Sequence, residues 1–168
     1  MNSVVNKLEL NSQVVTDPRE MTDCFTVWYE DLWKEDVEND VDFMRLKKYK
    51  WKTISEDEGL NLCREFELKE LWKAVMGLGR GKSPGTDGFV LEFYINCWDT
   101  VEASLKEEFE KFYRTRRLSE GWKDTLLVMI PKKEKPSRIV DFRPIALCNI
   151  VYKILAKTLV NRIRPFFG

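Results

Sequence analysis

The 168-residue sequence contains no histidine, and its cysteines include no pair at the spacing of a zinc site. Zinc in proteins is held mostly by clustered thiolates and imidazoles, so these absences argue against a structural zinc site. We predict buried free thiols in a reducing intracellular setting, either nucleus or cytoplasm. The four cysteines lie far apart, at Cys24, Cys63, Cys97 and Cys148.

Long hydrophobic runs are also missing. No stretch of 18 apolar residues occurs and no Arg-flanked apolar leader opens the chain, so neither a membrane span nor export is predicted. We find no internal repeat and no low-complexity tract. The apolar fraction is nevertheless 43%, with six Trp and ten Phe along the chain. This composition is typical of a packed domain and not of a disordered tail.

The formal charge is zero, but the charges are unevenly distributed. Residues 1–110 carry 14 basic and 24 acidic side chains, whereas residues 111–168 carry 14 basic and only 4 acidic ones. A basic segment suits a polyanion, because each neutralised phosphate releases condensed counterions. Lys and Arg that serve only solubility give the same count. On charge counts alone, solubility is the favoured explanation.

Hydrophobic spacing predicts a mainly helical chain of the α+β class. Asp17 is a capping residue before Pro18, so the first helix is expected to begin there. Residues 1–15 show no clear period, and the charged residues 35–52 are predicted to form an exposed connector. The first helix is expected to bury Met21, Cys24, Phe25, Trp28 and Leu32. Further helices are predicted at about 67–76, 89–98, 100–113 and 148–164.

A β-hairpin is predicted from an apolar run at 125–130, a polar segment at 132–137 and a weakly alternating segment at 138–142. Basic side chains gathered at such a tip can clamp a triphosphate, lysine as a point charge and arginine as a planar fork. An exposed turn kept soluble by lysine explains the same residues at least as well. The basic residues of the tip are Lys132, Lys133, Lys135 and Arg138.

The segment 82–88, Lys-Ser-Pro-Gly-Thr-Asp-Gly, predicts a loop of specified shape. Gly85 and Gly88 permit positive φ, and the Asp87 side chain can bond its own backbone. Backbone N–H groups exposed in this loop can meet phosphates, with Lys82 alongside. A plain connection between two helices also has this composition, so both interpretations stay open.

The last predicted helix carries a polar face beside an apolar row. This face can follow a nucleic-acid backbone. A solvated amphipathic helix is an equally good interpretation. The residues of the polar face are Lys153, Lys157, Asn161 and Arg164.

Four segments, taken in order, resemble non-LTR retrotransposon reverse transcriptases, in particular those of the plant LINE-type group. Their order and spacing are more specific than any one segment, and the resemblance covers most of the chain from about residue 16. The segments are 66–71 (FELKEL), 81–89 (GKSPGTDGF), 127–133 (LVMIPKK) and 141–147 (DFRPIAL), followed by Tyr-Lys at 152–153.

The resemblance implies an RNA-directed DNA polymerase whose partners are an RNA template, a DNA primer and a dNTP. Residues 66–168 then form a partial reverse transcriptase domain, the fingers, and residues 1–65 a helical extension and connector. Lys132 or Lys133, with Arg138, resembles the pair that grips the triphosphate. Arg143 resembles the fingers arginine near the templating nucleotide. The expected template-side residues are Lys82, Ser83, Gly85, Asp87, Gly88, Lys153 and Lys157.

The chain also departs from the family. Ala146 stands where the family often has Ser, and the palm strands with the metal-binding aspartates lie downstream of the shared part. Two Mg²⁺ ions require converging carboxylates, but the sequence has no Asp-Asp pair. Its densest acidic runs, at 35–36 and 56–58, are predicted to be solvated connectors.

We therefore expect no catalytic residue, metal site or cofactor in this chain alone, although Mg²⁺ is expected for the complete parent enzyme. Without the palm sheet, apolar surface is expected on the hairpin and at Phe166 and Phe167. The alternative function is a co-opted nucleic-acid-binding or regulatory module without enzymatic activity.

Overall fold

The computed structural model describes residues 5, 7–10, 13–34 and 53–166. The predicted connector at 35–52, with the acidic pair at 35–36, and Phe167 lie outside the described residues. The chain divides into two compact units, one formed by residues 1–50 with 127–145 and the other by residues 51–126 with 146–168. The sequence-based division after residue 65 stays a prediction.

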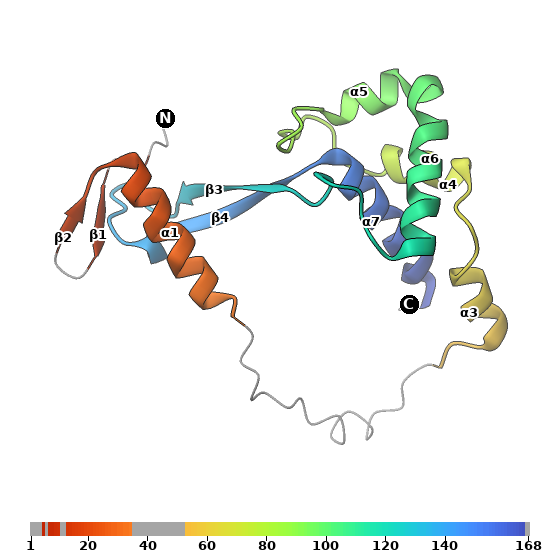
Figure 1. The fold of residues 1–168 in the computed structure, drawn as a ribbon, viewed down its shortest axis with the longest axis horizontal. Coiled ribbons are helices and arrows are strands. Elements are labelled where there is room, and N and C mark those ends of the chain that lie inside the picture. Colours follow the sequence, from red (N-terminus) through yellow and green to blue (C-terminus); the bar gives the residue numbers. More distant parts are fainter. Residues whose placement is uncertain (1–4, 6, 11–12, 35–52, 167–168) are drawn as a thin grey trace. The chain divides into compact units, whose positions relative to one another are not determined.

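The predicted α+β class with mainly helical content is confirmed (Figure 1). The strands form two separate two-stranded sheets, β1 with β2 and β3 with β4. In chain order the elements are β1 Leu8–Leu10, β2 Gln13–Val15, α1 Pro18–Leu32, α3 Glu56–Leu62, α4 Leu68–Met76, α5 Leu91–Asn96, α6 Trp98–Thr115, β3 Thr125–Pro131, η1 Ile139–Asp141, β4 Phe142–Cys148, α7 Ile150–Ile163 and η2 Arg164–Phe166. None of the helices in this described part is long and apolar enough to cross a membrane.

Helix α1 begins where the sequence predicts. The Asp17 carboxylate accepts hydrogen bonds from the backbone N–H groups of Arg19 and Glu20 at 2.9 and 3.1 Å, and Pro18 is the first helical residue.

The predicted core stripe of α1 is only partly correct. Met21, Phe25 and Tyr29 form the buried row, Cys24 and Trp28 are half-buried, and Leu32 is 57% exposed. The buried positions recur every fourth residue, so Tyr29 takes the place expected for Leu32.

The core of the first unit joins α1 to the N-terminal strands and to the turn of the β3–β4 hairpin. Phe25 packs edge-to-face on Phe142, with ring centroids 5.4 Å apart. Leu8 and Ile139 are buried in the same cluster. The backbone N–H of Glu9 donates to Ser137 O at 2.6 Å. The antiparallel β1–β2 pair was not predicted, because three-residue strands are too short to show an alternating pattern.

The predicted hairpin is present, but its second strand begins at Phe142 and not at Arg138. Residues Ile139–Asp141 instead form a 3₁₀ turn in which Ile139 and Asp141 are both buried. Exposed apolar surface on the hairpin is confirmed, since Leu126, Leu127, Val128 and Ile130 are 36% to 50% exposed. Phe166 is half-buried, contrary to the expectation of an uncovered ring.

In the second unit, α4 packs against α7 and α6. Leu71, Ala74 and Val75 of α4 are buried, whereas Leu68 and Met76 are exposed. Ala74 is fully buried in the core although its side chain is small. From the other helices, the core receives Leu105, Phe109, Ile150, Val151, Ile154 and Leu155.

Two helix starts differ from the sequence-based expectation. Helix α6 begins at Trp98, two residues before the predicted start at residue 100. Residues 56–58, expected in a solvated connector, form the first turn of α3. Ser55 and Glu58 make a reciprocal capping box there, and carboxylates near a helix N-terminus are favoured by the backbone dipoles.

Candidate nucleic-acid interface

Two basic side chains of the hairpin tip, Lys133 and Arg138, lie beside one buried carboxylate, that of Asp141. Its Oδ2 accepts hydrogen bonds from the backbone N–H groups of Ser137 and Arg138 at 3.1 and 3.0 Å. Lys133 Nζ lies 2.9 Å from the same oxygen, and Arg138 Nη2 lies 3.8 Å from Oδ1. One acidic residue therefore holds both the turn of the backbone and two of its cations.

Lys132 is held at the same turn by two backbone carbonyls, those of Val140 and Asp141. Its Nζ donates to Val140 O and its backbone N–H to Asp141 O, both at 2.8 Å. The side chains of Lys133 and Arg138 remain 50% and 67% exposed. The three predicted triphosphate-gripping residues are thus brought together, each tethered on one side and open to solvent on the other.

The Asp141 carboxylate is ionised at neutral pH. Lys133 is the main cause that holds its pKa well below the usual range, and the N–H groups of Arg138 and Ser137 add to this against the opposing effect of burial. Because the pKa is lowered on folding, these contacts stabilise the tip above the ordinary pKa of an aspartate. The contribution is lost as the pH falls through the acidic range.

Asp141 was missed as a functional residue by sequence reasoning, which used it only as part of a family motif. The sequence does contain one sign of this role, a single acidic residue that follows several basic ones. Asp141 lies three and four residues after Arg138 and Ser137, a spacing at which a carboxylate can accept hydrogen bonds from the backbone of the preceding turn. Its neighbours Ile139 and Phe142 are buried in the core of the first unit and fix its backbone.

Arg143 lies on β4 and is exposed. Between these described residues, no hydrogen bond or ion pair joins the Arg143 side chain to the group around Asp141. Its expected role beside the templating nucleotide stays a prediction.

The loop at 82–88 is fixed in the second unit by Asn149, which precedes α7 and is 3% exposed. Asn149 Oδ1 accepts hydrogen bonds from Thr86 Oγ1 and from the Asp87 backbone N–H, both at 3.2 Å. Asn149 Nδ2 donates to Gly121 O at 2.8 Å. A single buried amide therefore joins the loop, the turn before β3 and the start of α7.

The two loop glycines are required for different reasons. Gly88 has the expected positive φ, at +75°. Gly85 does not; a Cβ there would lie 2.5 Å from the backbone N of Asn149 and 2.7 Å from its Cα. Gly85 is needed because the loop packs directly against the backbone of Asn149, a contact that the sequence did not reveal.

Replacing Gly85 with Ala is expected to lower the free energy of unfolding of the second unit by about 1–3 kcal/mol, because the loop must move off Asn149. Gly59→Ala is the matched control, since no atom lies within 4 Å of the added carbon and alanine is favoured in a helix. Urea denaturation followed by tryptophan fluorescence measures both. Equal stability of the two variants would contradict the close packing.

Two backbone N–H groups of the loop, those of Asp87 and Gly88, and the N–H groups of the flanking Gly81 and Phe89 donate within the chain. Phe89 N–H donates to Asp87 Oδ1 at 3.0 Å, which confirms that Asp87 bonds its own backbone, and Gly88 N–H donates to Gly85 O at 3.3 Å. The N–H of Gly81 donates to Glu92, whose pKa it lowers. The side chains of Lys82 and Ser83 are exposed and can meet a phosphate.

A pocket of about 690 Å³ lies beside this loop, and Asp87, Tyr94, Trp122 and Asn149 are among its lining residues. Burial, and then the charge of Asp87, raises the pKa of Tyr94 to about 12. The pocket disfavours phosphate, because the acidic side chains that line it repel an anion. The carboxylates lining the pocket are Asp87, Glu108, Glu120 and Asp124.

The predicted polar face of the last helix is partly covered. Lys153 and Lys157 are half-buried on α7, and Lys157 Cε would lie 3.2 Å from a Cβ on Gly77, so its stem rests against the end of α4. Arg164 is exposed. The loop and these lysines belong to the second unit, whereas Lys132, Lys133, Arg138 and Arg143 belong to the first.

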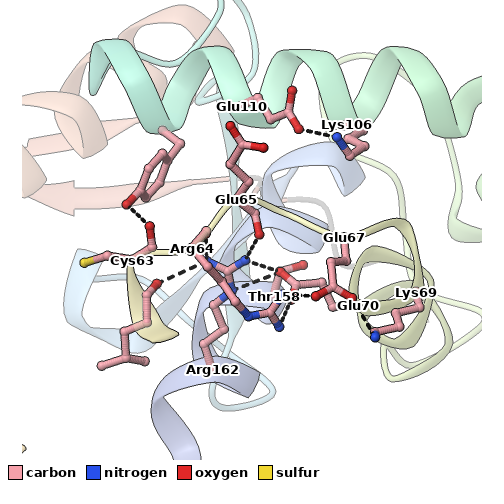
Figure 2. A network of polar contacts seen from close by, with 12 residues as sticks. Cys63, Arg64, Glu65, Glu67, Lys69, Glu70, Lys106, Glu110, Thr158 and Arg162 are labelled. Carbon is pink, nitrogen blue, oxygen red and sulfur yellow. Dashed lines mark hydrogen bonds and ion pairs between the residues drawn. The ribbon is translucent and has the colours of Figure 1, made fainter. Parts of the chain in front are cut away.

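Sequence reasoning also missed Arg162, which organises the polar network shown in Figure 2. Its guanidinium bonds Glu70 Oε1 at 2.6 and 2.9 Å and lies 4.5 Å from the centre of the Phe66 ring. It also donates to the carbonyls of Leu62, Arg64 and Glu65 at 3.1, 2.7 and 2.8 Å. Arg162 thus fastens α7 to the segment between α3 and α4.

No group of three or more Cys, Asp or Glu able to hold a metal ion occurs in the described ranges.

Comparison with known proteins relates the chain to a mobile element. A protein from Xenopus laevis described as a transposon TX1 uncharacterized 149 kDa protein is 30% identical over 111 residues. The chain is similar to a transposon protein. The match covers 66% of this chain but only 8% of the length of that relative. No family model matches the chain.

Proposed function

We propose that the chain is the nucleotide- and template-gripping part of a reverse transcriptase from a non-LTR retrotransposon of the plant LINE type. The order of the four resembling segments and the similarity to a transposon protein support this proposal. The observation that carries it is the grouping of Lys132, Lys133 and Arg138 around the buried Asp141.

The chemistry of the tip suits a triphosphate. Each lysine ammonium offers three N–H donors and the guanidinium five, and the recorded contacts of these three side chains engage only some of them. The turn that carries these groups is held by backbone and carboxylate hydrogen bonds, so little ordering entropy is lost when an anion binds. A nucleotide with three clustered phosphates meets several cations at once.

The 168 residues by themselves are proposed to bind without polymerising, with RNA template, DNA primer and dNTP as the partners of the parent enzyme. We assign no catalytic residue to these 168 residues. In a primer-extension assay with Mg²⁺ and all four dNTPs, we expect no extension. Incorporation of even one nucleotide would overturn this part of the proposal.

The triple variant Lys132→Ala, Lys133→Ala, Arg138→Ala is expected to weaken binding of a fluorescent dATP analogue by at least about tenfold, because charge-assisted bonds to phosphate are lost. Fluorescence anisotropy at constant ionic strength measures the affinity. The matched control removes three exposed cations of the second unit, Lys73, Arg114 and Arg117, and is expected to change affinity less than about twofold.

Equal weakening in the two variants would overturn the assignment of the tip. A nucleic-acid-binding module without a nucleotide site is the second candidate, favoured by the basic excess of residues 111–168. It predicts salt-dependent binding of RNA with no preference for a triphosphate. A filter-binding titration at two salt concentrations, run beside the nucleotide titration, separates the two functions.

A further inference from the structure

We propose that Asp141 is a positioning residue, which orients Lys133 and Arg138 for a triphosphate; this inference rests on the function proposed above. The carboxylate binds the turn from inside, through the N–H groups of Ser137 and Arg138, and holds Lys133 Nζ at 2.9 Å. Its side chain is 8% exposed, while the side chains it contacts are at least half exposed. It acts on a nucleotide only through these cations.

The negative charge of Asp141 lowers the attraction of the hairpin tip for anions, so its presence among the cations needs a separate explanation. A tip that attracted polyanions by charge alone would bind better without a carboxylate among its cations. An asparagine accepts hydrogen bonds from backbone N–H groups as well, so the turn does not require the charge. Only an ionised carboxylate attracts the ammonium and the guanidinium and limits where they extend.

The first unit holds Asp141 firmly. Phe142, the next residue, is 2% exposed and stacks edge-to-face on Phe25, and Ile139, two residues earlier, is 5% exposed. The backbone of Asp141 closes the turn through Lys132 N–H and Arg138 O. The orientation of the cations is therefore set by a buried support and not by the solvent-exposed turn itself.

The test compares Asp141→Asn with Glu134→Gln, because Glu134 is exposed on the same turn and both changes remove one negative charge. Affinities for dTTP and dTMP are measured without added metal, by competition against a fluorescent triphosphate. We expect the dTTP preference to fall on the order of tenfold in Asp141→Asn and to stay unchanged in Glu134→Gln. Equal preferences in the two variants would overturn the inference.

Failure of the proposed function gives a different result. If the unaltered chain shows no preference for dTTP over dTMP, the nucleotide site itself is wrong. If that preference is present and survives Asp141→Asn, only the positioning role is wrong.

Folding of the tip is checked by hydrogen exchange of the Glu9 and Lys132 amides, which bond Ser137 O and Asp141 O. If Asp141→Asn loses this protection, the dTTP preference is measured instead in Asp141→Glu, which keeps the negative charge. We expect Asp141→Glu to retain the preference within about threefold. A protected Asp141→Glu variant with no preference would overturn the inference.

Discussion

Replacing Arg162 with Met is expected to lower the free energy of unfolding of the second unit by about 3–5 kcal/mol, because Glu70 loses its buried partner and keeps only the more exposed Arg64. Three backbone carbonyls between α3 and α4 lose their donors as well. Chemical denaturation followed by tryptophan fluorescence measures the loss. Arg164→Met is the matched control, since Arg164 is exposed two residues later.

A double variant tests the reason for this loss. Changing Glu70 to Leu together with Arg162→Met removes both buried charges, and part of the stability is expected to return. If Arg162→Met is no more destabilising than Arg164→Met, the network of Figure 2 does not hold the second unit together.

Replacing Phe25 with Ala is expected to lower the stability of the first unit by about 3–5 kcal/mol, the usual cost of removing a buried aromatic ring. The effect reaches the hairpin, because Phe25 packs on Phe142 beside Asp141. Hydrogen exchange is expected to become faster at the Lys132 and Glu9 amides. Val27→Ala, at a 65% exposed position of α1, is the control.

The outcome bears on function as well as on stability. If α1 supports the tip, Phe25→Ala weakens nucleotide binding although Phe25 lies far from the basic residues in sequence. Unchanged protection of the tip amides in a folded Phe25→Ala variant would show that the hairpin is fixed independently of α1.

Local features were predictable from the sequence. Asp17 before Pro18 marks the start of α1, because a capping side chain and a fixed proline φ act on neighbouring residues. The hydrophobic spacing at 67–76 predicts α4, and the apolar run at 125–130 predicts β3. In each case the physical cause lies within a few residues of the pattern.

Contacts between distant residues were not predictable. Arg162 bonds Glu70 across 92 residues, and Asn149 bonds Thr86 across 63, so no local pattern reveals either pair. The same limit explains Gly85, whose need for close approach depends on a residue far along the chain. Asp141 falls between these cases, since its own contacts are local but the next residue, Phe142, packs on the distant Phe25.

The acidic pocket also refines the expectation for the template-side loop. Asp87 faces a pocket with three other carboxylates, whereas Lys82 and Ser83 are exposed side chains at the start of the loop. Any template contact is therefore expected at residues 82–83, and Gly85 and Asp87 shape the loop through Asn149.

Site-resolved hydrogen exchange with and without a saturating deoxynucleoside triphosphate tests the central claim most directly. We predict new protection at residues 132–138 of the hairpin tip, with little change at the acidic pocket beside Asp87. Protection confined to the pocket, or none anywhere at saturation, would contradict a nucleotide-gripping hairpin.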